Sequence, residues 1–312
     1  MLQKALASRR VGHAYIFSGI AGIGKKTTAL AFASALNCGD RADLPDACGS
    51  CPSCLKISRG NHPDIHIVAS DTQFIRIDAI RHIEQQMTFR PLEGKRRVFI
   101  IDDADKMNDQ AANALLKTLE EPTPGNLIIL VSARPRSLPL TILSRCQRVN
   151  FQPLPADTVA RWLVETGGKN TQRAYLLASL SGGSISQALE LDAQDLMAFR
   201  AELGRLLSAS HTGEPMSLLA LSAFLGENKK EIRQGLKILN TYFRDALVYK
   251  ETCRDSMVVN AHDLPCVSSL ARRLTGRQIL DNIALVERSA TLLEMNVNKS
   301  LTLETMAFKL SL

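Results

Sequence analysis

A glycine-rich segment near the N-terminus constrains the fold of this 312-residue chain more than any other feature. An apolar run, Ala14-Tyr15-Ile16-Phe17, leads to Gly19, Gly22 and Gly24, and Lys25 then begins a helical pattern. Glycines let the backbone wrap around phosphate oxygens, and a helix start directs N–H groups and a positive dipole end at an anion. The pattern predicts a phosphate-binding loop in which Lys25 would reach the β- and γ-phosphates of a nucleotide.

A second motif favours this interpretation over a plain glycine-rich turn. The apolar run Val98-Phe99-Ile100-Ile101 ends in Asp102 and Asp103. Asp102 matches the aspartate that faces the magnesium ion of a bound nucleotide. Asp103 stands where many ATPases carry a glutamate that activates water, and its side chain is one methylene shorter, which reduces its reach. Acidic residues that merely end a strand are the alternative.

The residue after the loop lysine departs from the motif. It is Lys26, where the motif has a serine or threonine whose hydroxyl helps to hold Mg²⁺. An ammonium has no oxygen to offer a cation, and Thr27 lies about 100° farther round the helix. We therefore expect magnesium coordination to be weakened, whereas the loop backbone and Lys25 remain available to ATP or ADP.

Four of the seven cysteines lie in one short segment: Cys38, Cys48, Cys51 and Cys54. In a reducing compartment, such a cluster indicates a metal site rather than disulfides. Four thiolates at this spacing suit Zn²⁺ in a closed, structural, tetrahedral site. A redox-active pair or unpaired thiols are the alternatives.

Strand and helix patterns alternate through residues 1–151. Apolar runs predict strands at 14–17, 65–68, 98–101 and 127–131, and we expect a fifth, shorter strand at 148–151. Helical patterns occupy 26–36, 76–89 and a segment that Asn108 caps and Pro122 ends. Because the strands are apolar throughout, we expect a parallel sheet with helices on both faces.

The pattern changes at Gln152-Pro153-Leu154-Pro155, after which strand signals cease. Short helices at 157–166, 172–180 and 184–191 predict a small helical domain over 152–192. Longer helices at 196–208, 216–226, 229–251, 276–295 and 300–311 predict an all-helical domain over 193–312.

Composition excludes several classes of protein. Hydrophobic residues make up 45% of the chain, which is typical of globular proteins. No apolar run has the ~20 residues of a membrane helix, and the first residues lack the apolar core of a signal peptide, so a cytoplasmic location is expected. A net charge of +7 suits work near nucleic acid. No carboxylates outside the acidic strand suit two-metal nucleotidyl transfer, so polymerase activity is not expected.

The segment Ile142-Leu143-Ser144-Arg145-Cys146 follows the fourth predicted strand. By itself, Arg145 reads as an arginine near a helix end. Together with His13 to Gly19, the cysteine segment and Leu115 to Pro122, it makes nearly the whole chain resemble the bacterial clamp-loader family of AAA+ proteins, and within it the delta-prime-type subunits of DNA polymerase III.

This resemblance implies a P-loop AAA+ type α/β domain over 1–151 with an inserted zinc module at 38–54, a lid domain over 152–192 and a C-terminal oligomerisation collar over 193–312. It also implies that Arg145 is an arginine finger, which stabilises charge on the ATP of a neighbouring motor subunit. The implied partners are tau/gamma motor subunits, a clamp-opening delta subunit, and the sliding clamp and primed DNA through the assembly.

The motor subunits of the same family are the close competitor. Motors carry threonine after the loop lysine, Asp-Glu on the acidic strand, and Gly-Ser-x-Arg in the lid domain. The matching positions here are Lys26, Asp103 and Ser186. These departures favour a stator, which supplies an arginine to a neighbour's ATP, over an autonomous ATPase motor. A zinc-dependent DNA-binding module is a third hypothesis. Family members usually begin upstream of the position of Met1, which implies a longer native N-terminus or a misassigned start.

Overall fold

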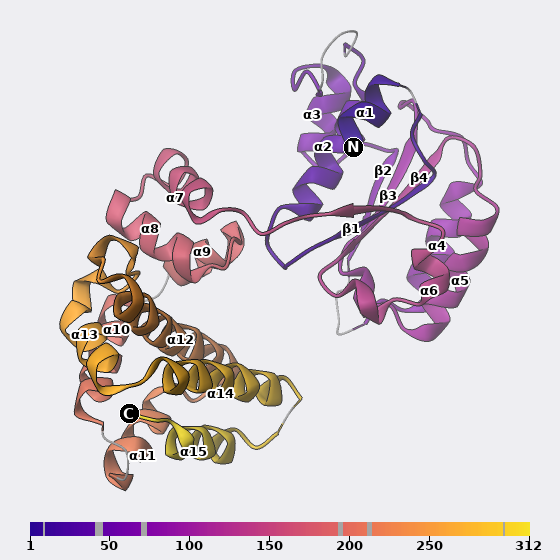
Figure 1. The fold of residues 1–312 in the computed structure, drawn as a ribbon. Coiled ribbons are helices and arrows are strands. Elements are labelled where there is room, and N and C mark those ends of the chain that lie inside the picture. Colours follow the sequence, from indigo (N-terminus) through magenta and orange to yellow (C-terminus); the bar gives the residue numbers. More distant parts are fainter. Residues whose placement is uncertain (9, 41–45, 70–73, 193–195, 211–213, 296) are drawn as a thin grey trace. The chain divides into compact units, whose positions relative to one another are not determined.

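A computed structural model describes residues 1–312 except 9, 41–45, 70–73, 193–195, 211–213 and 296. The described chain forms two compact units: residues 1–155 with 183–186, and residues 156–182 with 187–312. The first unit is a sheet flanked by helices, and the second consists of helices (Figure 1). The predicted boundary between lid and collar, at 192–193, falls at residues outside those described.

Five parallel strands form the sheet of the first unit, in the order β2-β3-β4-β1-β5. The strands are β1 (Ala14–Ser18), β2 (Ile65–Val68), β3 (Arg97–Ile101), β4 (Asn126–Ser132) and β5 (Gln147–Asn150). Because β4 pairs with both β1 and β3, the loop after β1 and the acidic residues after β3 lie at the same edge of the sheet. This arrangement confirms the predicted parallel α/β fold.

Alternate residues of the central strands enter two separate cores. Ile16 and Phe99 pack with α4, α5 and α6, whereas Tyr15 and Ile100 pack with α1 and α2. These helices are α1 (Leu2–Ala7), α2 (Lys25–Asn37), α4 (Ile77–Met87), α5 (Asp109–Glu120) and α6 (Leu140–Leu143). Burial on both faces is the reason that these strands are apolar throughout.

The second unit contains a hydrophobic core. Its helices are α7 (Ala156–Glu165), α8 (Thr171–Leu180), most of α9 (Ile185–Asp192), α10 (Leu196–Ala209), α11 (Pro215–Phe224), α12 (Lys229–Thr252), α13 (Leu264–Arg273), α14 (Gly276–Glu294) and α15 (Lys299–Lys309). Tyr242 and Phe243 of α12 are fully buried in this core. None of the described helices is long and apolar enough to cross a bilayer.

Sequence patterns located most of these elements. The predicted cap of α5 is present, since Asn108 Oδ1 accepts a hydrogen bond from the N–H of Ala111 at 2.8 Å. Helices α1, α3 (Pro52–Ser58), α6 and α13 were not predicted. A proline in the first turn of α3 and of α13 is compatible with a helix start, because the missing N–H has no intrahelical partner there. That signal was available in the sequence.

Candidate nucleotide and metal sites

The phosphate loop connects β1 to the first residue of α2. Gly22 and Gly24 have φ values of 72° and 98°, a region that side chains disfavour. A Cβ at Gly22 would also lie 2.5 Å from Ser184 Oγ. Only glycine suits this backbone, and α2 begins directly after the loop with no side-chain cap on its first N–H groups.

Lys25 points back into the loop. Its side chain is buried, and its Nζ donates to the carbonyl oxygens of Gly19 and Ile20, each at 2.7 Å. Burial lowers the pKa of this lysine, and the nearby carboxylates of Asp102 and Asp103 oppose that shift. An ammonium has three N–H donors, so one remains for a ligand. The buried ammonium is thus held at the loop with one N–H donor unused.

Lys26 lies beside the acidic strand. Its Nζ is 3.0 Å from Oδ2 of Asp102, the residue predicted to face magnesium. The Lys26 side chain is 46% exposed and that of Asp102 is 22% exposed. Thr27, one residue farther along α2, is exposed. Mg²⁺ requires close octahedral oxygen ligands, and here the hydroxyl is absent and the carboxylate is paired. The residues present therefore do not fit a magnesium ion.

Asp103 is turned toward another lysine. It has a left-handed backbone, with φ of 51°, and its Oδ2 is 2.7 Å from Lys106 Nζ. Sequence reasoning did not single out Asp105, whose side chain is 4% exposed and accepts hydrogen bonds from Ser132 Oγ (2.7 Å) and from Arg134 Nε (3.2 Å). A third acidic residue so close to Asp102 was the available signal. Asp105 thus joins the end of β4 to the turn after β3.

Residues 183–186 belong with the first unit. The N–H of Ser186 lies 3.3 Å from the carbonyl oxygen of Gly22 in the phosphate loop. This position is where a motor would carry its additional arginine, and a serine side chain has no positive charge to place over a phosphate. The structure therefore brings the three departures from the motor pattern, Lys26, Asp103 and Ser186, into one unit.

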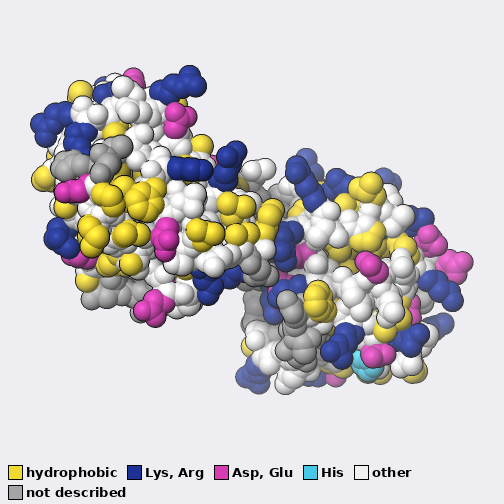
Figure 2. Space-filling model, turned by 90° about the horizontal axis from the view of Figure 1, so that it is seen from below, with side chains coloured by type: hydrophobic (Ala, Val, Ile, Leu, Met, Phe, Trp, Pro, Cys, Tyr) yellow, Lys and Arg dark blue, Asp and Glu magenta, His cyan; other side chains and the backbone are white. Residues whose placement is uncertain are grey.

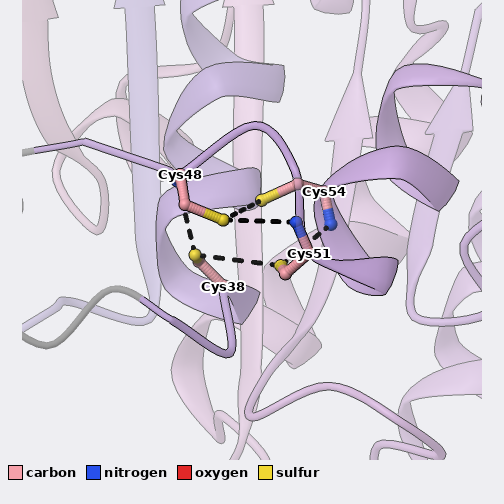
Figure 3. A group of neighbouring side chains, drawn as sticks. All are labelled: Cys38, Cys48, Cys51 and Cys54. Atoms are coloured by element: carbon pink, nitrogen blue, oxygen red, sulfur yellow. Dashed lines mark hydrogen bonds between the residues drawn. The ribbon is translucent and has the colours of Figure 1, made fainter.

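The four predicted metal ligands converge (Figure 3). Their sulfur atoms all lie within 4.8 Å of one another, and the Cys38–Cys51 and Cys48–Cys54 pairs are each 3.9 Å apart. A tetrahedral Zn²⁺ with Zn–S bonds of about 2.3 Å separates its sulfurs by about 3.8 Å. The separation fits that ion and far exceeds a disulfide bond of about 2.05 Å.

Local backbone geometry aims these thiols. Cys38 follows the last residue of α2, Cys51 caps α3, and Cys54 lies inside α3, whereas Cys48 lies in the loop between the two helices. The N–H of Cys51 donates to Cys48 Sγ at 3.3 Å. The N–H groups of Cys51 and Ser50 lower the pKa of Cys48 to about 6, and burial raises the pKa of Cys54 to about 11.

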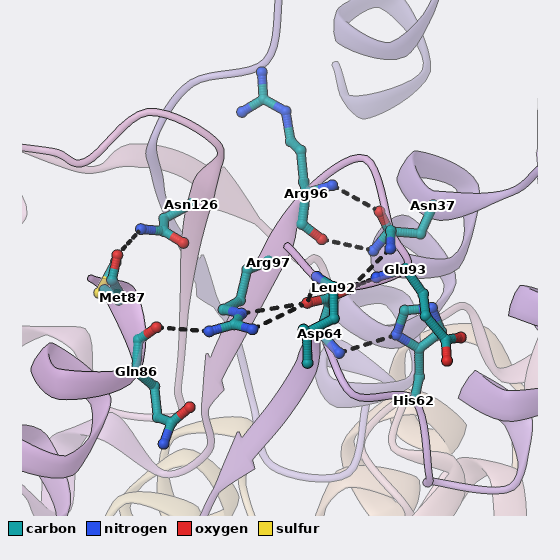
Figure 4. Close-up of polar contacts among 11 residues, drawn as sticks. Asn37, His62, Asp64, Gln86, Met87, Leu92, Glu93, Arg96, Arg97 and Asn126 are labelled. Carbon is teal, nitrogen blue, oxygen red and sulfur yellow. Dashed lines mark hydrogen bonds and ion pairs between the residues drawn. The ribbon is translucent and has the colours of Figure 1, made fainter. Parts of the chain in front are cut away.

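Buried polar contacts tie the cysteine segment to the sheet (Figure 4). Asn37, which precedes Cys38, accepts from the N–H of Arg96 and donates to its carbonyl oxygen, each at 2.9 Å. Asp64 accepts from the N–H groups of residues 92, 93 and 94 and from Nε and Nη2 of Arg97. None of these anchoring residues was singled out from the sequence.

Arg145 lies just after α6. Its Nη1 donates to the carbonyl oxygen of Thr141 at 3.0 Å and lies 3.4 Å from Ser144 Oγ. Its Nη2 is 2.6 Å from Oε1 of Glu120, the last residue of α5. The Arg145 side chain is 35% exposed. The structure thus places Arg145 at the end of α6 and gives it no contact with the phosphate loop of its own chain.

Comparison with known proteins identifies the family. The family described as "DNA polymerase III, delta subunit" matches residues 1–155, and "DNA polymerase III, delta subunit, C terminal" matches residues 194–311. The chain is 31% identical to DNA polymerase III subunit delta' of Bacillus subtilis over 304 residues, covering 96% of this chain and 90% of that protein. It is 36% identical to subunit delta' of Pseudomonas aeruginosa over 64% of this chain and 63% of that protein.

A tau subunit and a solved structure are also similar to this chain. Subunit tau of Bacillus subtilis is 32% identical over 80% of this chain, and the match spans 48% of that longer protein. A DNA polymerase III gamma-subunit-related protein from Thermotoga maritima aligns over 98% of this chain and 97% of its own at 19% identity, with a TM-score of 0.48. Similarity to a delta' subunit along nearly the entire length of both sequences shows that the chain belongs to the DNA polymerase III delta' subunit family.

Proposed function

We propose that this chain is the stator of a cytoplasmic clamp loader. It would assemble with tau/gamma motor subunits and a delta subunit, and help to place the sliding clamp on primed DNA during replication. The observation that carries the proposal is an asymmetry between two sites. At its own phosphate loop, Lys26 pairs with Asp102 at 3.0 Å, whereas Arg145 is intact and half-exposed.

Arg145 would act in trans, on the ATP of a neighbouring motor. Its planar guanidinium remains charged at any working pH. The contacts with Thr141 and Glu120 hold the side chain at the end of α6, and a held cation loses little freedom when a phosphate arrives. An arginine supplied in this way raises the rate of phosphoryl transfer by about 10³–10⁵.

Hydrolysis by the chain itself is not expected. We assign nucleotide contacts to Gly19, Gly22, Gly24, Lys25, Thr27, Asp102 and Asp103. Of these, Asp102 is engaged by Lys26, and Asp103 is engaged by Lys106 at 2.7 Å. A phosphate loop without a magnesium site, whose two nearby carboxylates are both paired with lysines, lacks the main parts of a motor.

The helices over 193–312 would form the collar that holds the ring, and those over 152–192 would form the lid. Hydrophobic side chains gather on the face of the helical unit at left in Figure 2. Large exposed apolar residues of α11, α14 and α15 include Met216, Leu280, Leu301 and Phe308. Exposed apolar area of this kind is typical of protein–protein contacts.

The cysteine cluster would hold Zn²⁺ as a structural ion through Cys38, Cys48, Cys51 and Cys54. Four thiolates fill the coordination sphere and leave no position for substrate, so a catalytic role is not proposed. The bound ion would fix the end of α2 against the start of α3, and thereby support the helix that carries Lys25.

Steady-state ATP hydrolysis tests the stator proposal. The purified chain is assayed alone and with its motor and delta partners, as wild type, Arg145→Ala and Arg148→Ala. Arg148 is an exposed arginine three residues away and serves as the matched control. We expect no turnover by the chain alone, turnover in the mixture, a large loss with Arg145→Ala and none with Arg148→Ala. Turnover by the isolated chain would identify a motor instead, and an Arg145→Ala mixture as active as wild type would exclude the finger.

A further inference from the structure

The ion pair between Lys26 and Asp102 bears on the form in which the phosphate loop binds nucleotide, as well as on the missing magnesium site. We propose that the phosphate loop binds nucleotide as the metal-free anion, with the ammonium of Lys26 in the place of the magnesium ion. This inference rests on the proposed nucleotide contacts of the loop and is independent of the role of Arg145.

The phosphate side of the site is intact. The loop glycines have the backbone that a wrapped loop needs, and Lys25 is anchored to Gly19 and Ile20 with one N–H still unused. The first N–H groups of α2 have no side-chain cap. These groups recognise a terminal polyphosphate by its oxygens and negative charge, and none of them requires a metal.

At the position where a motor binds magnesium, this chain has the ammonium of Lys26. In a motor, a hydroxyl and a carboxylate hold Mg²⁺, which neutralises phosphate charge. Here a lysine occupies the hydroxyl position, and its Nζ lies 3.0 Å from Asp102 Oδ2. One N–H of this ammonium serves Asp102, and the other two are left for phosphate oxygens.

A magnesium ion could enter only by displacing this ammonium. The incoming ion would have to break the pair with Asp102, and two like-charged cations would then share a small site. It would also lack the hydroxyl ligand that position 26 supplies in motors. Free ADP or ATP avoids both penalties, so binding should not be improved by magnesium and should weaken where magnesium sequesters the nucleotide.

The test is a fluorescence titration of the full chain with N-methylanthraniloyl-ADP, in EDTA and again in excess MgCl₂. The variants are wild type, Lys26→Thr and Lys56→Thr. Lys56 is the matched control, since it is an exposed lysine that pairs with Glu93 at 2.6 Å, away from the loop. Thermal unfolding of each variant checks that it is folded. Lys25→Met, which removes the phosphate contact, checks that the signal comes from the loop.

For wild type and Lys56→Thr we expect the dissociation constant in EDTA to equal or be lower than that in MgCl₂. For Lys26→Thr we expect the order to reverse, with binding at least about tenfold tighter in MgCl₂. Wild-type binding that requires magnesium would overturn the inference and leave the nucleotide contacts standing. Absence of binding by wild type and Lys26→Thr under both conditions would refute the nucleotide contacts as well.

Discussion

Replacing Asp64 with asparagine should destabilise the first unit strongly. Asp64 is fully buried, and Arg97, its partner across β2 and β3, is 2% exposed. Its two carboxylate oxygens accept three backbone N–H groups at 2.7–2.9 Å and two from the guanidinium, each at 3.3 Å. Asp64→Asn keeps the shape, but it removes the charge that compensates Arg97 and replaces an acceptor with a donor.

The expected cost follows from burial. Removing one partner of a buried ion pair costs about 3–5 kcal/mol, because the other charge stays buried without compensation. The matched control is Glu93→Gln, which breaks the ion pair between Glu93 and Lys56. The Glu93 side chain is 48% exposed and the Lys56 side chain is 42% exposed. Exposed pairs contribute about 0–1 kcal/mol, so the control should remain close to wild type.

The dependence on pH has a definite sign. Burial alone would raise the pKa of Asp64, but the N–H groups of residues 92–94 and Arg97 outweigh it and hold the pKa below the ordinary value of 3.8. A depressed pKa adds stability above that ordinary value, and the contribution is lost as pH falls through the folded-state pKa. The gap between wild type and Asp64→Asn should therefore be full at neutral pH and shrink below about pH 3.8.

Urea unfolding followed by two probes measures this effect. Far-UV circular dichroism reports both units, whereas the single tryptophan, Trp162, lies in α7 of the second unit. Asp64→Asn should lower the urea concentration at the midpoint of the first unit's transition, which only circular dichroism detects. The midpoint of the transition reported by Trp162 fluorescence should not change. An Asp64→Asn variant within about 1 kcal/mol of wild type, or a Glu93→Gln variant equally unstable, would refute the reasoning.

Two further predictions concern the metal site and the collar. Cys51→Ser should remove bound zinc, measured as metal content by mass spectrometry, because three thiolates do not close a structural site. The control variant, Cys266→Ser, changes a buried cysteine outside the cluster and should keep the zinc. Equal metal content in both variants would contradict the assignment. Leu280→Asp, at an exposed apolar position of α14, should weaken assembly with motor and delta subunits at least about tenfold by sedimentation. The control, Leu92→Asp, is exposed in the first unit, and equal loss in both would argue against a collar contact.

The local sequence pattern predicted most strands and helices of the first unit. The strands over 14–17, 98–101 and 127–131 are apolar throughout because their alternate residues enter two cores, and this property is visible in the sequence. Helix α13 was missed, although Pro265 in its first turn is compatible with a helix start. Arg200, the largest fully buried side chain among the described residues, was also not anticipated, because charged residues are rarely buried unless paired.

The candidate site divides in the same way. Glycine spacing, the lysine at the start of a helix and the four cysteines each lie within one short stretch of chain, so the sequence by itself determined the glycine loop before α2 and the four cysteines that come together. The spacing of Cys38, Cys48, Cys51 and Cys54 even anticipated that their sulfurs would meet.

Tertiary structure alone decided which distant charges became partners. Lys26 reaches Asp102 because β4 pairs in parallel with both β1 and β3, which brings the ends of those two strands to one edge. Arg145 finds Glu120 because α5 and α6 cover the same face of the sheet. A charged side chain shows no preference for one distant opposite charge over another until strand order and register place it within a few ångströms, since Coulomb attraction through water is weak beyond that range.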